Sequence, residues 1–317
     1  MKKERIKLHA RKWAVAILRA VFLLAFAYIL IYPVLFMISN ALKTSADNMN
    51  PAVTWLSRAP TLYSFQAAFT IMDYPRALLN TVKFELISAV IEVFVCAVYA
   101  YGLARFKLRF KRVMMFFLVL IILVPDVMLI IPRIVNFRHM DFLGILGLLK
   151  ELTGVDLRPN LTDSVLTFYL PSLFGVGLKG GLFIYIYMQF FKGLPAELEE
   201  AAWLDGAGPF TTFMRVILPS SGVVILTVFI FSFVWHWNDW LLAIMYTDQN
   251  DTLAVITKNI NQYISYASES AVIQLDSKRS FGIPLAACLL YIAPPTVLYL
   301  ILQKKFIQSI DRVGIVG

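Results

Sequence analysis

The sequence predicts an all-α membrane protein with six transmembrane helices, and three observations lead to that fold class. Only 15% of the 317 residues are charged, whereas 59% are hydrophobic. Water-soluble domains carry about 25% charged residues, so this chain has too few to cover a water-exposed surface. The apolar residues form long runs, and lysine and arginine are divided unevenly between the segments that connect those runs. All three features are typical of a helical bundle in a bilayer.

Six apolar runs are long enough to cross about 30 Å of hydrocarbon at about 1.5 Å per residue. Several of them contain proline, which membrane helices tolerate where neighbouring groups satisfy the freed carbonyl oxygens. The expected spans are 20–39, 82–104, 113–132, 166–191, 222–246 and 283–303.

The orientation of these spans follows from the positive charges between them. The segments 1–19, 105–112, 192–220 and 303–317 hold 17 lysines and arginines in 71 residues, whereas the three other connections hold 10 in 106 residues. Lysine and arginine gather in cytoplasmic loops. We therefore expect both termini on the cytoplasmic side and a multi-pass protein of the bacterial inner membrane, in contact with lipid.

The chain is expected to form one transmembrane domain with short cytoplasmic ends. The basic segment 1–19 precedes the first span, and its apolar run continues too far for a cleaved signal peptide. The transmembrane domain covers 20–303 and the tail covers 304–317. The two cysteines lie within apolar runs, so we expect neither a disulfide framework nor a metal site.

The segment 193–219, between the fourth and fifth spans, differs from the other short connections. Pro195 suits a helix start, acidic residues follow in the first turn, and Gly206 permits the backbone conformation that ends a helix. Pro209 then suits the start of a second short helix. The apolar positions Leu198, Ala201, Ala202 and Leu204, then Phe210, Phe213, Val216 and Ile217, predict a helix–turn–helix that lies along the membrane surface.

The same stretch resembles the signature of binding-protein-dependent ABC importer permeases. That signature is Glu-Ala-Ala, three residues, Gly, nine residues, then Ile-x-Leu-Pro. Here Glu200, Ala201, Ala202, Gly206, Leu218 and Pro219 fall at those positions, with Val216 in place of the isoleucine. The segments 100–106, 205–207 and 237–240 resemble the carbohydrate-uptake branch, and the tail 308–317 is similar to the end of the maltose importer's smaller permease.

The resemblance implies a type I ABC importer permease that forms half of a translocation path for a sugar or oligosaccharide. It also implies a second, different permease chain, two ATPase subunits that bind ATP and magnesium, and an extracytoplasmic solute-binding protein. In this family the short loop docks on the ATPase. The residues expected to couple to the ATPase are Glu200, Ala201, Ala202, Asp205, Gly206, Ala207, Leu218 and Pro219. An amphipathic surface helix without a partner is the simpler alternative.

Ionisable residues inside the apolar runs are the candidates for the substrate path. Each costs about 2.5–3.5 kcal/mol in hydrocarbon on insertion scales, so such residues face the bundle interior and form pairs or line a path. The candidates are Glu92, Asp126, Lys179, His236, Asn238 and Asp239. Internal pairing, such as Lys179 with Asp126 or Glu92, is the alternative role, and for any one residue it is the more favoured of the two.

Several function classes have no support in the sequence. No Gly-x-x-x-x-Gly-Lys-Ser/Thr phosphate loop is present, so the chain is not the ATPase, and no catalytic constellation indicates an enzyme. No cofactor is expected on this chain, and no basic, aromatic-rich segment indicates nucleic-acid binding. The remaining alternatives are an ion-coupled secondary transporter that uses Asp126, Glu92 and Lys179, and an ABC permease for a solute other than a sugar.

Overall fold

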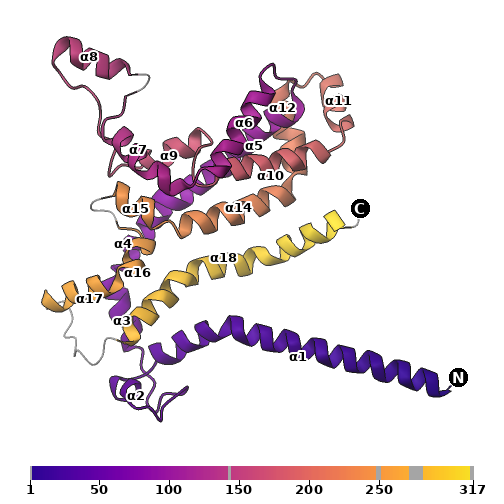
Figure 1. Ribbon diagram of the computed structural model, residues 1–317, viewed down its shortest axis with the longest axis vertical. Helices are drawn as coiled ribbons and strands as arrows, with labels where there is room; N and C mark the ends of the chain where they lie inside the picture. Colours follow the sequence, from indigo (N-terminus) through magenta and orange to yellow (C-terminus); the bar gives the residue numbers. More distant parts are fainter. Residues whose placement is uncertain (1, 142–143, 248–250, 271–280, 315–317) are drawn as a thin grey trace. The chain divides into compact units, whose positions relative to one another are not determined.

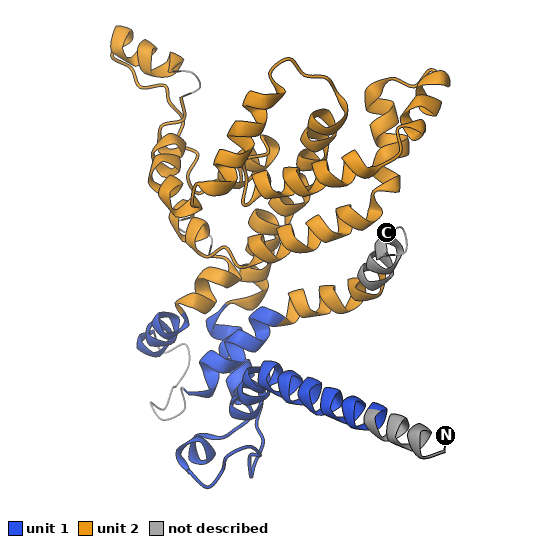
Figure 2. Cartoon of the chain, turned by 45° about the vertical axis from the view of Figure 1, so that its right-hand side comes forward, with its two compact units in different colours: residues 1–72, 260–292 blue, residues 73–259, 293–317 orange. Residues whose placement is uncertain are grey.

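The computed structural model describes residues 2–141, 144–247, 251–270 and 281–314, and the side chains within 12–305 of these. Every regular element among the described residues is a helix (Figure 1). The chain divides into two compact units, one of residues 1–72 and 260–292 and the other of residues 73–259 and 293–317 (Figure 2). The predicted all-α fold is therefore confirmed.

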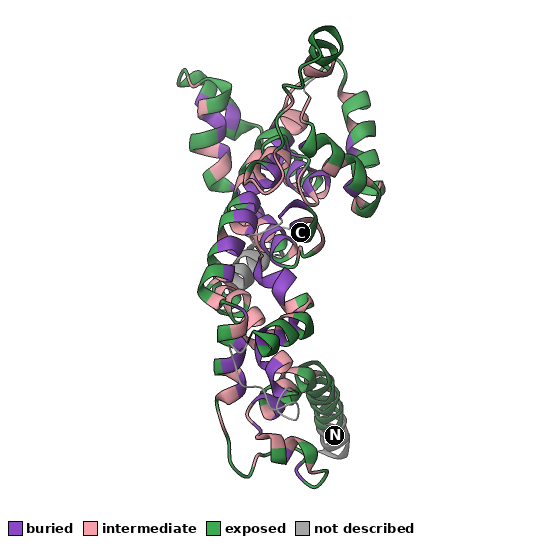
Figure 3. Ribbon diagram, turned by 90° about the vertical axis from the view of Figure 1, so that its left-hand side faces the viewer, coloured by how far each residue is buried: buried purple, intermediate pink, exposed green. Residues whose placement is uncertain are grey.

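The first unit contains one very long helix and several short ones. It comprises α1 (Lys2–Ala41), α2 (Ser45–Met49), α3 (Tyr63–Ile71), α17 (Ile260–Glu269) and the first part of α18 (Gly282–Gly314). The membrane-length part of α1, Lys12–Ala41, has none of its most apolar window buried and is mostly exposed up to its last two residues, Asn40 and Ala41, which are buried (Figure 3). A helix that is apolar and uncovered in this way is suited to contact with lipid or with another membrane protein.

The second unit is built around one central helix. That helix is α5 (Ile87–Arg105), which continues α4 (Tyr74–Thr81) through a π-helical turn, η1 (Val82–Leu86). It packs along α10 (Gly180–Gly193) and α14 (Gly222–Trp237) (Figure 1). The buried side chains between these helices include Cys96, Ala97, Phe183, Tyr187, Met188 and Val228.

The other helices of the second unit are shorter. They are α6 (Lys111–Leu123), α7 (Asp126–Arg138), α8 (Ile145–Thr153), α9 (Leu166–Leu173), α11 (Glu197–Leu204), α12 (Pro209–Thr212), the π-helical η2 (Phe213–Ile217), α13 (Leu218–Ser220), α15 (Leu241–Tyr246) and α16 (Leu253–Lys258).

Only three of the six predicted spans are continuous, membrane-length helices among the described residues. These are Lys12–Ala41, Tyr74–Arg105 and Gly282–Lys305, and each is longer than predicted. Two further spans are bent pairs, α6 with α7 at 101° and the helical segment Pro209–Ser220 with α14 at 82°. The described chain thus holds up to five spans by length and composition, and the prediction of six transmembrane helices is not confirmed.

The breaks have identifiable causes in the sequence. The third predicted span is broken after α6 at Val124. This residue is extended (ψ 121°) because the following Pro125 disfavours a helical backbone there. The fourth is interrupted between α9 and α10, where Gly175 and Lys179 adopt positive φ angles of 68° and 65°. Left-handed residues cannot continue a right-handed helix. The fifth stops at Asn238, after which α15 begins at Leu241.

Candidate functional site

The segment 193–219 forms the predicted helix–turn–helix. Helix α11 ends at a turn in which Gly206 has a φ of 80°, a left-handed conformation that glycine adopts without the strain of a Cβ. Pro209 then begins α12, and η2 and α13 complete the segment. Two local rules, proline at a helix start and glycine after a helix end, are thus sufficient to explain the turn.

The side of α11 that faces the protein differs from the prediction. The buried residues are Glu199 and Ala202, whereas Leu204 is 89% exposed and Leu198 is also exposed. In the second part, Phe213 and Ile217 are buried as expected, but Phe210 is exposed. Of the four apolar positions predicted for α11, only Ala202 is buried, and the other inward position is held by a charged residue, Glu199.

A groove with a volume of 740 Å³ lies along this segment. Five of the eight predicted coupling residues line it: Ala201, Ala202, Asp205, Gly206 and Ala207. Of the other three, Glu200 and Pro219 are exposed, and Leu218 packs against the core. The small side chains leave the backbone accessible, so a segment from another protein can approach closely here.

The inner face of the same segment is tied to the end of α5. The Arg105 Nη2 donates a hydrogen bond to the Leu194 carbonyl oxygen at 2.7 Å. The Arg105 Nε lies 3.3 Å from the Glu199 Oε1, and both side chains are largely buried. The local sequence distinguishes neither residue, because Arg105 is one of five basic residues in 105–112 and Glu199 is one of three acidic residues in the first turn of α11. The contact joins positions 94 residues apart, so no local pattern could indicate it.

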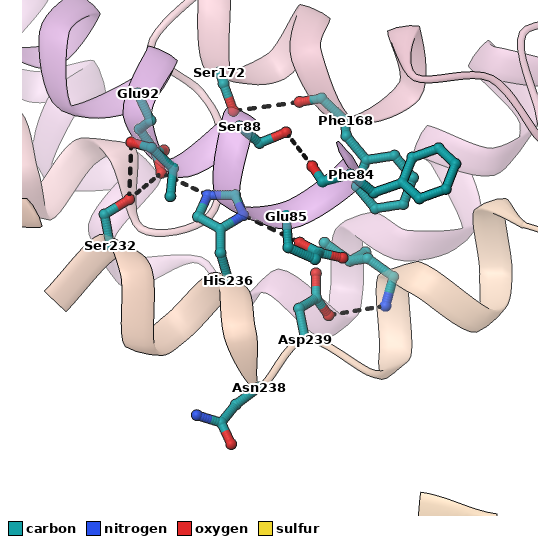
Figure 4. Close-up of polar contacts among 12 residues, drawn as sticks. Phe84, Glu85, Ser88, Glu92, Phe168, Ser172, Ser232, His236, Asn238 and Asp239 are labelled. Atoms are coloured by element: carbon teal, nitrogen blue, oxygen red, sulfur yellow. Dashed lines mark hydrogen bonds and ion pairs between the residues drawn. The ribbon is translucent and has the colours of Figure 1, made fainter. Parts of the chain in front are cut away.

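A second group of polar residues is buried between α5 and α14 (Figure 4). The imidazole of His236 lies between two carboxylates, with Nδ1 3.2 Å from the Glu85 Oε2 and Nε2 3.0 Å from the Glu92 Oε2. Ser232, one turn earlier on α14, donates to the same Glu92 oxygen at 3.4 Å. Glu85 and Glu92 share one face of the π- and α-helical rod because they are seven residues apart.

The glycine-rich break of the fourth span closes over this group. A Cβ on Gly177 would lie 2.5 Å from the Glu92 Oε1, and one on Gly180 would lie 2.5 Å from the Gly175 carbonyl oxygen. Only hydrogen atoms fit in either place. The glycines thus let the chain between α9 and α10 pack directly on the Glu92 carboxylate.

The remaining substrate-path candidates lie at the breaks of the third, fourth and fifth spans. The Lys179 Nζ is 2.6 Å from the Asp126 Oδ2, which joins the break before α10 to the start of α7. Asp239 accepts a hydrogen bond from the Leu242 amide at 3.0 Å, and the exposed Asn238 donates to the Val234 carbonyl oxygen at 2.7 Å. Internal pairing is therefore what the structure shows for Glu92 with His236 and for Asp126 with Lys179.

Comparison with known proteins agrees with this architecture. The chain is 24% identical over 289 residues to the sulfoquinovosyl glycerol transport system permease protein SmoH of Agrobacterium fabrum, which covers 90% of this chain and 89% of that protein. It is 27% identical over 289 residues to the trehalose transport system permease protein SugB of Mycobacterium tuberculosis, with 90% and 92% covered.

A solved structure has the same fold. It is the crystal structure of a bacterial ABC transporter involved in the import of the acidic polysaccharide alginate, one chain of which matches with a TM-score of 0.71 at 20% identity. The match covers 92% of this chain and 96% of that one. The model of the family described as binding-protein-dependent transport system inner membrane component matches residues 94–312. The chain belongs to that family, and it is therefore a permease subunit of an ABC importer, as the loop signature predicted, and not an enzyme.

Proposed function

We propose that this permease carries a sugar or oligosaccharide and that it forms half of the translocation path. The relatives named above are permeases for sulfoquinovosyl glycerol and for trehalose, and the matching structure belongs to an alginate importer. These cargoes share a glycosidic, hydroxyl-rich chemistry. The cargo of this chain is expected to have the same chemistry, which agrees with polar and aromatic side chains at the breaks of its spans.

The observation that carries the proposed coupling to an ATPase is the open groove on the segment 193–219. Its lining residues include Ala201, Gly206 and Ala207, whose small size admits another backbone, and Glu200 is exposed beside it. We propose that an ATPase subunit binds in this groove on the cytoplasmic side. ATP and magnesium then reside on two such ATPase subunits, and both termini of this chain are cytoplasmic.

The complete importer is proposed to contain two further kinds of partner. A second, different permease chain supplies the other half of the path, and an extracytoplasmic solute-binding protein delivers the cargo. The exposed apolar length of α1 is consistent with contact to lipid and to a second membrane subunit.

The substrate contacts are proposed for residues at the breaks. Asn238 is exposed, and Asp126 and Lys179 keep 28% and 39% of their side-chain surface accessible, so all three can reach a sugar hydroxyl group. Asp239 directly follows Asn238 in the connection between α14 and α15. Glu92 and His236 are buried and paired, so their part is to hold the helices that present the other residues.

The test is reconstitution of the chain with its ATPase, second permease and binding protein in liposomes. Radiolabelled trehalose, sulfoquinovosyl glycerol and alginate oligosaccharides are the probes. We expect uptake of at least one probe that requires ATP inside and the binding protein outside, and that an ionophore does not reduce. Uptake driven by an ion gradient without ATP would contradict the proposal. Uptake of sn-glycerol 3-phosphate and of none of these sugars would contradict the assignment of a sugar as cargo.

A further inference from the structure

The C-terminal end of α5 holds the segment 193–219 at two separate places. The first is Arg105, whose guanidinium bonds the Leu194 carbonyl oxygen and pairs with Glu199. Glu199 is 4% exposed, although Glu197 and Glu200 on the same helix are exposed. Of the three acidic residues in α11, one therefore faces α5 and two face outward.

The second place is Tyr101, one helical turn before Arg105. Its ring packs on Phe213 of η2 with 5.0 Å between ring centroids, and on Phe191 at 6.1 Å. Phe213 and Ile217 are 1% and 0% exposed. The inner face of the segment is thus fixed to α5 at both of its arms, while the groove on its outer face stays open.

The N-terminal part of the same helix contributes Glu92 to the buried polar group. Glu92 lies about 20 Å along α5 from Arg105, at 1.5 Å per residue, and it is bound to His236 of α14. The α-helix between the two positions contains no proline, so it has no evident point at which to kink. A helix of this kind can pass a displacement of one end to the other.

We propose that the Arg105–Glu199 pair is the link through which movement of the segment 193–219 is passed to α5 and from there to the Glu92–His236 group. Arg105 and Glu199 are positioning residues, since neither lies in the open groove. A guanidinium suits this task because its Nη2 can donate a hydrogen bond to the Leu194 carbonyl oxygen while its positive charge pairs with the Glu199 carboxylate, whose Oε1 lies 3.3 Å from the Nε. The packing of Tyr101 keeps the segment folded, and the ion pair and hydrogen bond of Arg105 connect the segment to α5.

This inference rests on the proposed docking of an ATPase in the groove, and its test separates the two. The complete importer is compared by hydrogen exchange without nucleotide and with ATP and vanadate, and exchange is followed in 85–92 and in 193–219. In the unmodified chain we expect a nucleotide-dependent change in both segments. No change in 193–219 would refute the docking itself. A change in 193–219 without one in 85–92 would refute the link.

The variants then test the pair. Glu199→Gln keeps the shape of the side chain but removes its charge, and Arg105→Gln removes both the hydrogen bond to Leu194 and the ion pair with Glu199. We expect each to keep the change in 193–219 and to lose more than half of the change in 85–92, while exchange without nucleotide stays as in the unmodified chain. The double variant should lose no more of the change in 85–92 than either single variant, because both substitutions act through one contact. Lys107→Gln, at an exposed position in the connection that follows α5, is the control and should behave as the unmodified chain.

A full response in 85–92 in both single variants would overturn the inference. So would raised exchange throughout 193–219 without nucleotide in Glu199→Gln, since that result would show that the pair only stabilises the fold of the segment.

Discussion

The Nε2 of His236 lies 3.0 Å from the Glu92 Oε2, although the two residues are 5% and 0% exposed. They join α14 to α5 within the bundle, and Glu85 completes the group on the other side of the imidazole. Two carboxylates around one imidazole are costly to bury, and removing one partner from such a group leaves a charge without compensation.

His236→Ala should therefore destabilise the protein strongly, by about 3–5 kcal/mol, the range for breaking a buried pair. Glu92→Gln should destabilise the protein less, because the glutamine amide can still accept a hydrogen bond from, or donate one to, the imidazole and Ser232. The measurement is the thermal unfolding midpoint of the purified importer in detergent. Equal midpoints for the unmodified chain and His236→Ala would show that the group contributes no stability.

Gly180→Ala should destabilise the break before α10 by about 1–3 kcal/mol, the usual cost of overpacking. A Cβ there would lie 2.5 Å from a backbone oxygen, which cannot move aside as a side chain can. Gly177→Ala should instead displace the Glu92 carboxylate. Gly102→Ala is the matched control, because no atom lies within 4 Å of its Cβ and alanine favours a helix by up to about 1 kcal/mol. A Gly180→Ala protein with the midpoint of this control would contradict the packing described here.

Some features of these sites follow from local rules of the sequence, and others depend on contacts between distant residues. The turn at Gly206 was predictable because proline at a helix start and glycine after a helix end are local rules. The pairing of His236 with Glu85 was not, because 151 residues separate them. The sequence is compatible with pairing of Lys179 with either Asp126 or Glu92, and hydropathy alone does not decide between them.

The helix breaks were missed for a different reason. Membrane helices tolerate proline, so Pro125 and the glycines of 175–181 were compatible with continuous spans in the sequence. Whether the chain breaks depends on which neighbours satisfy the freed backbone groups, and that is a property of the packed fold. Similarly, Glu197, Glu199 and Glu200 are equivalent in a helix-dipole argument. Only the position of α5, which provides Arg105, explains why Glu199 is the one of the three that is buried.

Asp126→Ala and Lys179→Ala should each lower stability, and the double variant should lower it by less than the sum of the two. The coupling energy is expected near the lower end of the range of about 0.5–3 kcal/mol for contacting residues, because Lys179 is 39% exposed and solvent screens the pair. A double-mutant cycle on the unfolding midpoint measures it. If both single variants also leave substrate-stimulated ATPase activity unchanged, these residues have no part in substrate binding.

Asp156 provides a prediction about pH outside the spans. Its hydrogen bonds to Arg158 at 2.7 Å and to Lys150 at 2.9 Å hold the pKa of this carboxyl group well below its usual value of 3.8. A lowered pKa in the folded state means that the contribution to stability is present above pH 3.8 and is lost as the pH falls below it. Hydrogen exchange in 144–158 should therefore be protected equally at pH 7 and pH 5, once corrected for intrinsic rates. Protection already lost at pH 5 would contradict this assignment.

Gly206→Pro should separate transport from ATP hydrolysis. Gly206 has a φ of 80°, whereas proline fixes φ near about −65°, so the turn between α11 and α12 cannot keep its shape. Glu200→Lys should have a similar effect by reversing the charge beside the groove while leaving the buried Glu199 in place. In liposomes both variants should bind lipid and the second permease normally, yet show uptake near background with basal ATPase activity preserved. Gly193→Ala is the control, since its Cβ meets nothing within 4 Å at the beginning of the same segment, and it should transport normally. Normal uptake by Gly206→Pro would mean that the shape of this turn is not what the ATPase recognises.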